Sequence, residues 1–254
     1  MTKYKVARYH SMNQHINKPI FKIVSIDGNI GSGKSTILTH LKTVYQNNPN
    51  VIFLAEPVDE WNTICDKNGK TILRKFYEDQ NKYAFSFQMM AYISRLALMQ
   101  TKIQEITNYH QLQTDLDDKQ NHCYYIFTER SLHTDRDIFA KMLFDQGMIE
   151  EINYQIYQKW FDHFAYSPDI YIYISTDPNI CLERISKRAR DGEDTISLDY
   201  LSSCHQYHEN MFAPIKMNKP SEFLMLNGNN NDNHESLAKD LCKFMFIKSK
   251  YDFE

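Results

Sequence analysis

Residues 21–36 read FKIVSIDGNIGSGKST, and this stretch decides the fold. The apolar residues at its start predict a buried strand. Gly28 to Ser35 then fit the phosphate-binding pattern G-x-x-x-x-G-K-[ST]. Apolar residues recur after it at helical spacing: Ile37, Leu38 and Leu41. A plain glycine-serine turn is the competing interpretation, but a strand before the pattern and a helix after it favour a nucleoside triphosphate site.

Such a loop holds phosphate with its backbone. Glycines let the chain approach the phosphate oxygens closely, and successive N–H groups and the helix N-terminus point at the anion. Lys34 is expected to reach the β- and γ-phosphates, and the Ser35 hydroxyl is expected to bind Mg²⁺. The predicted phosphate-binding residues of the loop are Gly28, Asn29, Ile30, Gly31, Ser32, Gly33, Lys34, Ser35 and Thr36.

The composition fits one α/β domain, because the chain has 254 residues and 42% of them are hydrophobic. No apolar run approaches the length of a membrane span, so no membrane partner is expected. The net charge of −3 gives no reason to expect nucleic acid as a partner. Residues 1–18 are basic and contain no acid, which predicts a flexible tail before a single domain at residues 19–254.

The cysteine pattern points to a reducing compartment. The five cysteines include no C-x-x-C pair and show no zinc spacing with histidine. Their odd number and the lack of a secretory signal favour reduced thiols and a cytoplasmic location. Mitochondrial targeting stays open, although residues 1–18 lack the Ser-rich, amphipathic character of a transit peptide.

Buried strands and helices alternate along the rest of the chain. Apolar runs predict four more strands, at residues 51–54, 124–127, 170–174 and 223–226. Helices are predicted at residues 72–109, 135–147, 149–164, 179–188, 197–211 and 235–246, with irregular structure at 61–69 and 111–122. This alternation predicts a doubly wound α/β fold with a five-stranded parallel sheet, whose ligands bind at the carboxyl ends of the strands.

Charged residues follow the predicted strands at that edge. Glu56 follows the second strand, and Glu129 and Arg130 follow the third. The helix after the fourth strand leads to a basic cluster: Arg184, Arg188 and Arg190. A carboxylate after a strand is often only a helix N-cap, and arginines on a helix are often only solvated. Together with the loop, these residues indicate phosphoryl transfer, with a mobile arginine clamp and a carboxylate beside the attacking hydroxyl.

Five motifs recur in order along residues 20–246: Gly28 to Thr36, Glu56-Pro57-Val58 with Trp61, Phe85-Ser86-Phe87-Gln88, Glu129-Arg130-Ser131 with Asp135-Arg136, and Arg188-Ala189-Arg190. Their order and spacing resemble the deoxyribonucleoside kinases, most closely the deoxycytidine/deoxyguanosine (deoxyadenosine) kinase branch. The resemblance implies a P-loop kinase fold in which Arg188 and Arg190 form a lid over the phosphates. It also implies a homodimeric nucleotide-salvage enzyme that transfers the γ-phosphate of ATP, or another NTP, to the 5′-hydroxyl of a deoxynucleoside.

The family pattern implies three catalytic residues, Glu56, Arg130 and Lys34. Glu56 matches the general base beside the nucleoside 5′-hydroxyl, and Arg130 matches the arginine near that hydroxyl and the transferred phosphoryl. Glu129 matches the acid that, with Ser35, holds Mg²⁺ partly through water. Elsewhere the sequence departs from the family, because Ala189 stands where some members have glycine.

The resemblance also implies a nucleoside pocket. Gln88 matches the amide that pairs with the base edge, and Phe139 matches the ring that stacks on the base. Tyr77 and Glu193 match the pair that reads the sugar 3′-hydroxyl. Each residue alone fits an ordinary core or surface position, but the joint spacing favours the pocket. The implied nucleoside-binding residues are Glu56, Val58, Trp61, Tyr77, Phe87, Gln88, Arg95, Arg130, Asp135, Phe139 and Glu193.

Arg95 and Asp135 separate the branches of the family. In the thymidine-accepting kinases the matching positions are apolar or small, which leaves room for the thymine 5-methyl group. An arginine and an aspartate would fill that room and offer polar contacts to an exocyclic amino group or a purine edge. The pair therefore favours deoxycytidine, deoxyadenosine or deoxyguanosine over thymidine. A surface ion pair is the plainer interpretation of the same two residues.

Two other classes of protein share the phosphate loop. A nucleoside monophosphate kinase of the thymidylate type would need basic residues for the acceptor's phosphate, whereas Glu56 would repel it. A GTP-binding switch would need an N-K-x-D base reader and a D-x-x-G motif after a strand. Asp66-Lys67-Asn68-Gly69 follows no strand, and Asn218-Lys219-Pro220-Ser221 lacks the aspartate. Phosphorylation of a deoxynucleoside is therefore the favoured hypothesis.

Overall fold

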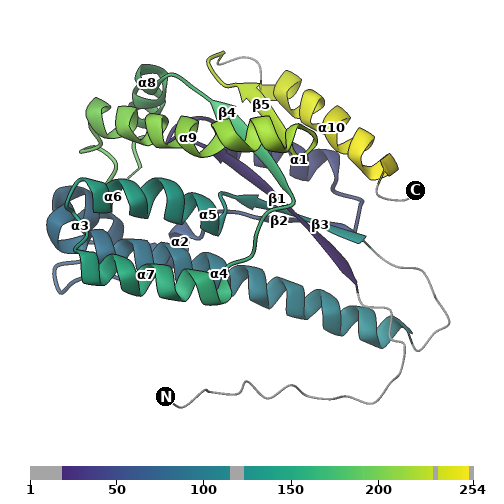
Figure 1. The fold of residues 1–254 in the computed structure, drawn as a ribbon, viewed down its shortest axis with the longest axis horizontal. Helices are drawn as coiled ribbons and strands as arrows, with labels where there is room; N and C mark the ends of the chain where they lie inside the picture. The colour runs from purple at the N-terminus through teal and green to yellow at the C-terminus, as the bar shows by residue number, and fades with distance from the viewer. Residues whose placement is uncertain (1–18, 115–122, 191, 231–233, 252–254) are drawn as a thin grey trace.

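A five-stranded parallel sheet forms the centre of the computed structural model, which describes residues 19–114, 123–190, 192–230 and 234–251. The strands are β1 (Ile20–Gly28), β2 (Val51–Leu54), β3 (Cys123–Glu129), β4 (Ile170–Ser175) and β5 (Phe223–Asn227). Their order is β2-β3-β1-β4-β5, and each pair of neighbours is parallel (Figure 1). The predicted sheet of a P-loop kinase fold is confirmed, with β1 in the middle.

Helices cover both faces of the sheet (Figure 1). On one face, α1 and α10 share a buried apolar cluster with the strands. On the other face, α3, α4, α6, α7 and α9 build a larger apolar cluster. The side chains of β4 alternate between the two, because Ile170, Ile172 and Ile174 join the first cluster and Tyr171 and Tyr173 join the second.

The helices are bounded as follows. The first half of the chain contains α1 (Lys34–Val44), α2 (Val58–Asn62), α3 (Ile72–Glu78) and α4 (Gln80–Thr114). Between β3 and β4 lie α5 (Leu132–Thr134), the π-helix η1 (Asp135–Ala140), α6 (Lys141–Asp145) and α7 (Glu151–Phe164). The remaining helices are α8 (Pro178–Arg188), α9 (Leu198–Asn218), the 3-10 helix η2 (Pro220–Glu222) and α10 (His234–Tyr251).

The helix expected at residues 72–109 is two helices, because the chain breaks at Asp79. That residue has φ −151° and ψ 85°, an extended conformation that ends α3 before α4 begins. α4 then continues to Thr114, so the irregular segment expected at residues 111–122 is wrong for residues 111–114. Residues 115–122 lie outside the described residues. Neither glycine nor proline stands near the break to announce it.

Two further segments differ from the sequence expectation. α2 forms around Trp61, where irregular structure was expected, because tertiary burial outweighs a weak local signal. The indole of Trp61 is buried, and its Nε1 donates to Ser94 Oγ at 2.9 Å. The helix expected at residues 135–147 begins as the π-helix η1 before α6 continues it. Such wide turns often occur at functional sites.

The ends of the chain leave one prediction open. Residues 1–18, the expected tail, lie outside the described residues, so the single domain at residues 19–254 stays a prediction. Within the described ranges, none of the helices is both long and apolar enough to cross a membrane.

The end of α8 supplies a test of backbone strain. Ala189 caps this helix in a left-handed conformation, with φ 50° and ψ 42°. A side chain in this region costs roughly 1–2 kcal/mol, and glycine avoids that cost. Glycine also gains freedom in the unfolded chain, which offsets part of the benefit. We therefore expect Ala189→Gly to raise the free energy of unfolding by about 0.5–1 kcal/mol, measured by urea denaturation.

Ala165→Gly is the matched control. Ala165 caps α7 in an extended conformation, with φ −67° and ψ 137°, so glycine relieves no strain there. We expect this variant to lower the free energy of unfolding. A fall of the same size in both variants would contradict the strain at Ala189.

Candidate active site

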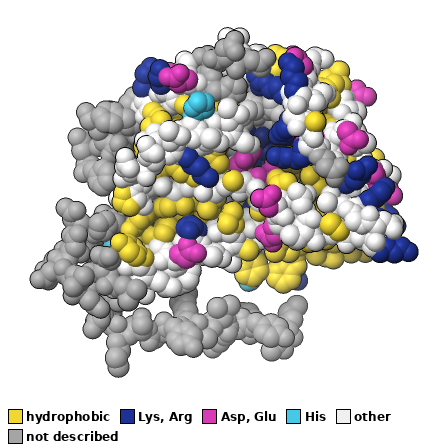
Figure 2. Space-filling view, turned by 180° about the vertical axis from the view of Figure 1, so that it is seen from behind, with side chains coloured by type: hydrophobic (Ala, Val, Ile, Leu, Met, Phe, Trp, Pro, Cys, Tyr) yellow, Lys and Arg dark blue, Asp and Glu magenta, His cyan; other side chains and the backbone are white. Residues whose placement is uncertain are grey.

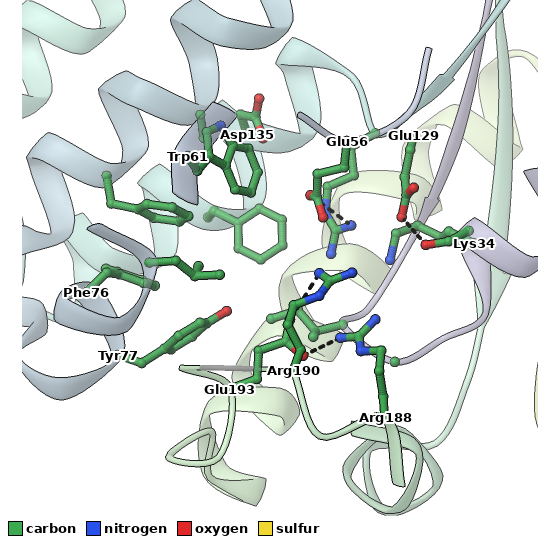
Figure 3. Close-up of a pocket in the computed structure, with 18 of the residues that line it drawn as sticks. Lys34, Glu56, Trp61, Phe76, Tyr77, Glu129, Asp135, Arg188, Arg190 and Glu193 are labelled. Atoms are coloured by element: carbon green, nitrogen blue, oxygen red, sulfur yellow. Dashed lines mark hydrogen bonds and ion pairs between the residues drawn. The ribbon is translucent and has the colours of Figure 1, made fainter. Parts of the chain in front are cut away.

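A cavity of about 430 Å³ opens at the carboxyl ends of the strands, where the topology predicts a ligand. The phosphate loop, the residues after β2 and β3, and helices α3, α4 and α9 all contribute to it (Figure 3). Figure 2 shows Lys and Arg side chains gathered beside Asp and Glu in a hollow of the molecular surface. The predicted site residues that line the cavity are Ile30, Gly31, Gly33, Lys34, Ser35, Thr36, Glu56, Trp61, Tyr77, Phe87, Gln88, Arg95, Glu129, Arg130, Asp135, Phe139, Arg188, Arg190 and Glu193.

The predicted residues that do not line the cavity are Gly28, Asn29, Ser32 and Val58. Gly28 lets the loop start close to β4. A Cβ at this position would lie only 2.7 Å from the Ile174 carbonyl oxygen, which is too close for a side chain. Asn29 anchors the loop to α9, since its Nδ2 donates to the Leu201 carbonyl at 2.8 Å. Val58 packs against the larger apolar cluster instead of facing the cavity.

Lys34 lies at the base of the loop and is only 4% exposed. Its Nζ donates to the Asn29 carbonyl oxygen at 2.7 Å. Burial, together with the positive charge of Arg130, lowers the pKa of Lys34 to about 7. A phosphate in the loop would give this ammonium group the anionic partner that its surroundings only partly supply.

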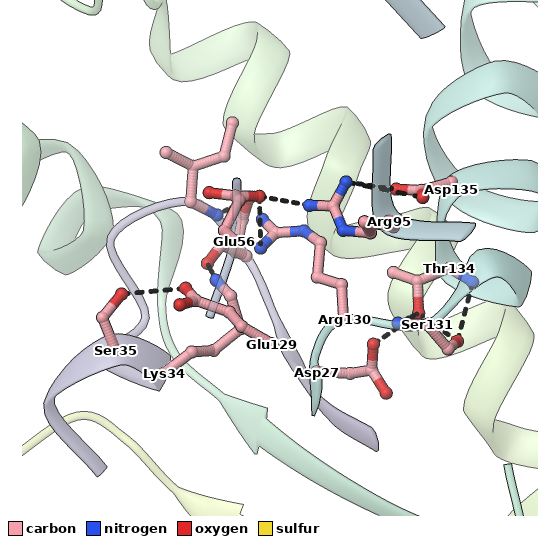
Figure 4. A network of polar contacts seen from close by, with 12 residues as sticks. Asp27, Lys34, Ser35, Glu56, Arg95, Glu129, Arg130, Ser131, Thr134 and Asp135 are labelled. Atoms are coloured by element: carbon pink, nitrogen blue, oxygen red, sulfur yellow. Dashed lines mark hydrogen bonds and ion pairs between the residues drawn. The ribbon is translucent and has the colours of Figure 1, made fainter. Parts of the chain in front are cut away.

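A hydroxyl and a carboxylate from distant segments meet beside the loop. Ser35 Oγ, in the first turn of α1, donates to Glu129 Oε1, at the end of β3, at 2.8 Å (Figure 4). Oxygen donors of this kind fit Mg²⁺, which also keeps waters and phosphate oxygens as ligands. No group of three or more His, Cys, Asp or Glu side chains in the described ranges could hold a metal alone. Magnesium bound here would therefore need oxygens from the nucleotide.

Two buried arginines, the buried Asp135 and the partly buried Glu56 form a cluster next to this pair (Figure 4). Arg95 Nη2 donates to Glu56 Oε1, and its Nη1 lies 3.2 Å from Asp135 Oδ1. Arg130 Nη1 lies 3.9 Å from Glu56 Oε1. The expected Arg95–Asp135 pair is thus present and buried, and it lines the cavity. The same arginine also binds Glu56, which the sequence did not indicate.

The pKa values of the two acids in this cluster are shifted in opposite directions. Burial would raise the pKa of Glu56, but the charges of Arg95 and Arg130 outweigh it and lower the pKa to about 2. Burial raises the pKa of Asp135 to about 6, because Arg95 and Arg130 offset only part of the desolvation. Glu56 therefore stays ionised near neutral pH, whereas Asp135 approaches the range in which it binds a proton.

Arg130 reaches the cavity through an unusual backbone. Its φ of 66° lies in the left-handed region that favours glycine, and its N–H donates to the Ile26 carbonyl at 3.0 Å. The guanidinium lies over the Phe139 ring, 4.9 Å from the ring centroid. This conformation turns the chain away from β3 and directs the cation into the cavity. A strained backbone at such a point is typical of a functional residue.

The opposite end of the cavity is a slot between aromatic rings. Phe76 and Phe87 stack at 4.6 Å between centroids, and Trp61 meets Phe87 edge-on at 5.4 Å. Gln88 is buried beside them, with an amide that can both donate and accept. Phe139 completes the lining. A flat heterocycle with polar edges suits this combination of apolar faces and a fixed amide.

The lid arginines are held by one acid. Arg188 Nη2 donates to Glu193 Oε2, and Arg190 Nη1 donates to Glu193 Oε1 at 3.3 Å. Figure 3 shows these three side chains beside Tyr77, whose hydroxyl end points into the cavity. The structure therefore brings Arg188, Arg190, Glu193 and Tyr77 together at one cavity. The predicted contacts with phosphate and with the sugar stay predictions.

Some residues of the site were missed from the sequence, and Arg184 lines the cavity with contacts that the sequence did not indicate. Arg184 was grouped with the anion clamp, yet its Nη2 donates to the Gly228 carbonyl at 2.8 Å and its Nη1 lies 3.4 Å from two phosphate-loop carbonyls. It therefore supports the loop. The other missed lining residues are Leu73, Phe76, Ala91 and Tyr200. Leu73, Phe76 and Tyr77 share one helical face, and this spacing was the available signal.

Comparisons with known proteins agree with this geometry. A family model described as deoxynucleoside kinase matches residues 24–245. Human deoxycytidine kinase is 31% identical over 250 residues, which cover 88% of this chain and 91% of that protein. Mitochondrial deoxyguanosine kinase of Xenopus laevis is 31% identical over 216 residues, 78% of this chain and 76% of that protein. Deoxycytidine kinase 2 of Gallus gallus is 30% identical over 204 residues, 73% and 72% of the two chains. A match over nearly all the described residues, on a fold with this loop and cavity, places the chain in the deoxynucleoside kinase family.

Proposed function

We propose that this deoxynucleoside kinase transfers the γ-phosphate of ATP to the 5′-hydroxyl of deoxycytidine, deoxyadenosine or deoxyguanosine. One observation carries the proposal: a single cavity joins the phosphate loop to the aromatic slot, and Glu56 lies between them (Figure 3). A base in the slot and a triphosphate in the loop would place the acceptor hydroxyl beside Glu56. Proximity of this kind supplies much of the rate in phosphoryl transfer.

On the donor side, the loop amides and Lys34 would hold the β- and γ-phosphates. Ser35 and Glu129 would hold Mg²⁺, partly through water, and the ion would neutralise charge on the phosphates when bound. Arg188 and Arg190 lie within the same cavity and would close over the transferred phosphoryl.

On the acceptor side, Glu56 selects a neutral hydroxyl. Its carboxylate is ionised, so it would repel an acceptor that carried its own phosphate, which disfavours a monophosphate kinase. A carboxylate whose pKa is near 2 is a weak base. It therefore orients the 5′-hydroxyl and takes its proton late, as the bond to phosphorus forms. Arg130, 3.9 Å from Glu56, would stabilise the charge that develops on the phosphoryl oxygens.

At the base end, Gln88 and the Arg95–Asp135 pair would read the nucleobase. Gln88 can pair with a Watson–Crick edge, and Phe139 and Phe87 can cover the faces of the ring. The ion pair lines the cavity and would occupy the room that a thymine 5-methyl group needs. Tyr77 and Glu193 would bind the sugar 3′-hydroxyl.

We also propose a homodimer formed through α4 and α7. Ile152, Ile156, Trp160 and Phe164 follow one another at four-residue spacing on α7, and each is at least 40% exposed. Ile93 on α4 is half exposed, and α4 contacts α7 at the preceding residue, Tyr92, whose hydroxyl donates to the Trp160 carbonyl at 3.0 Å. This apolar stripe on α7, together with Ile93 on the adjoining α4, suits an isologous contact with a second copy of the chain.

The cysteines support a reducing compartment such as the cytoplasm. Cys65 is an exposed free thiol, and Cys181 and Cys204 are buried free thiols. Free surface thiols are more common where disulfides do not form.

The reaction itself is the first prediction of this proposal. With Mg²⁺ and ATP, we expect turnover of deoxycytidine, deoxyadenosine or deoxyguanosine and poor turnover of thymidine. Glu56→Gln should lower kcat by roughly 10²–10⁴-fold and leave nucleoside affinity largely intact. Because the pKa of Glu56 is lowered to about 2, its carboxylate stays ionised from about pH 5 to 9, so kcat should not fall through its titration there.

Glu60→Gln is the control, because Glu60 is an exposed acid on α2, close in sequence to Glu56. It should leave kcat unchanged. If Glu56→Gln kept the kcat of the unmodified protein, Glu56 would have no part in the reaction. If the unmodified protein were inactive on all four deoxynucleosides, the proposed function would be overturned.

A second prediction concerns the base pocket. Arg95→Met combined with Asp135→Ala should raise kcat/KM for thymidine at least about tenfold, because both changes open the space at the 5-methyl position. The changes are made together, since Arg95→Met alone would leave the buried Asp135 without its ion-pair partner. Arg136→Met with Asp137→Ala is the control, because that ion pair, at 2.6 Å, does not line the cavity. No gain with thymidine, or an equal gain in the control, would show that the buried pair does not select the base.

The third prediction tests the dimer. Trp160→Glu places a charge at the middle of the apolar stripe and should convert the dimer to a monomer, measured by sedimentation velocity. Met217→Glu, at an 81% exposed site on α9, should leave the mass unchanged. A monomeric wild-type protein would refute the dimer, and a Trp160→Glu dimer would place the interface elsewhere.

A further inference from the structure

Asp27 is a buried acid that the proposed reaction does not use. It lies next to last on β1, directly before the phosphate loop, and it is fully buried. Burial raises the pKa of Asp27, and its hydrogen bonds to two hydroxyl groups act in the opposite direction. Burying a carboxyl group costs free energy that an apolar side chain of similar size would avoid. The position of its partners shows what the group does.

The two oxygens of Asp27 accept from two hydroxyl groups on different segments. Ser25 Oγ, on the same strand, donates to Oδ2 at 2.6 Å. Thr134 Oγ1, at the end of α5, donates to Oδ1 (Figure 4). Only the second bond leaves β1, and it spans 107 positions of the chain. Asp27 therefore ties the strand before the phosphate loop to the segment after β3.

The bond to Asp27 also sets the direction of the bonds around Thr134. Because its hydroxyl proton is given to Asp27, Thr134 Oγ1 can only accept from Ser131. Ser131 N–H lies 3.4 Å and Ser131 Oγ 2.9 Å from that oxygen. Ser131 Oγ in turn accepts from the Thr134 N–H at 3.1 Å. These reciprocal bonds form the capping box of α5, and Asp27 orients it.

This capping box stands between two residues of the active site. Arg130 directly precedes Ser131, and Asp135 directly follows Thr134. Arg130 is left-handed, a conformation that costs roughly 1–2 kcal/mol for a non-glycine residue and persists only where its surroundings fix it. The hydrogen bond from its own N–H to the Ile26 carbonyl holds the Arg130 backbone against β1, and the capping box holds the backbone that follows Arg130. Asp135 directly follows the capping box, and its side chain pairs with Arg95.

We propose that Asp27 is a positioning residue that, through Thr134, holds the Arg130–Asp135 segment in register with the phosphate loop. The inference rests on the role of Arg130 in the proposed function. A shift of about 1 Å in a charged group can cost as much as a hundredfold in rate, so a carboxylate that touches no substrate can still control transfer.

The test compares two hydroxyls that bind the same carboxylate. Thr134→Val removes the hydroxyl that leads to Arg130, and Ser25→Ala removes the one that stays on β1. We expect Thr134→Val to lower kcat about 10–100-fold with little change in the KM for ATP, and Ser25→Ala to keep kcat within about twofold. Thr134→Ser keeps the hydroxyl and should restore kcat. Asp27→Asn keeps the shape of the acid and should reproduce the loss, which supplies a second variant if Thr134→Val does not fold.

Hydrogen exchange of the Arg130 amide gives a readout that does not depend on activity. That amide donates to Ile26, so it should exchange at least about tenfold faster in Thr134→Val than in wild type, and at the wild-type rate in Ser25→Ala. Equal kcat and equal exchange in the two variants would overturn the proposal and leave Asp27 as an ordinary buried acid. A wild-type protein without kinase activity would count against the proposed function, whereas the exchange comparison would still decide whether Asp27 holds Arg130.

Discussion

The parallel pairing of β1 with β3 sets the geometry on which the active site depends. Ile26 on β1 is in register with Glu129 at the end of β3, and the phosphate loop begins two residues after Ile26. Because the strands run in the same direction, loop and acid emerge at one edge of the sheet. The Ser35–Glu129 contact follows from this register. One more backbone bond, from Arg130 to Ile26, extends the ladder beyond the strand and turns the arginine into the cavity.

Arg95 links the two halves of the site, because a single guanidinium binds both Glu56 and Asp135. The two acids share this cation unequally, and their pKa values of about 2 and about 6 show the difference. As the pH falls through 6, Asp135 gains a proton and its ion pair with Arg95 weakens, while Glu56 keeps its charge. Glu56, the acid proposed to lie beside the reacting hydroxyl, is therefore insensitive to pH near neutrality, whereas Asp135, the acid proposed at the base pocket, is not.

The parts of this structure that could be predicted from the sequence are those that depend on local patterns in short stretches of consecutive residues. The phosphate loop lies between a strand and a helix, and Glu56 and Glu129 follow apolar runs, so their meeting at one edge follows from a parallel sheet. The break at Asp79 has only the weak signal of an aspartate that can cap the next helix, as its Oδ1 does by accepting from the Lys82 N–H at 3.2 Å.

Other roles depend on contacts between distant segments. In the sequence, Arg184 is one member of a basic cluster. Its hydrogen bond to the Gly228 carbonyl is visible only in the folded structure. Asp27 reads as one more residue of a strand until Thr134 is placed against it. Val58 belongs to a family motif, yet it is partly buried against the larger apolar cluster and does not line the cavity. A motif carries the residue type, and only the fold decides which way the side chain faces.

The charge balance of the cavity explains how one site accepts two substrates of different charge. The described residues that line it include six basic side chains, Lys34, Arg95, Arg130, Arg184, Arg188 and Arg190, and four acids, Glu56, Glu129, Asp135 and Glu193. The cavity is thus positive although the whole chain carries −3. The acids do not neutralise the basic side chains evenly along the cavity. Glu56 and Asp135 pair with Arg95, whereas Glu193 pairs with the lid arginines, Arg188 and Arg190. Among the described residues, Lys34 Nζ donates to a backbone carbonyl and forms no ion pair with a carboxylate, at the place where a triphosphate would enter. The uncompensated charge therefore lies at the donor end, and the acceptor end is close to neutral, as an uncharged nucleoside requires.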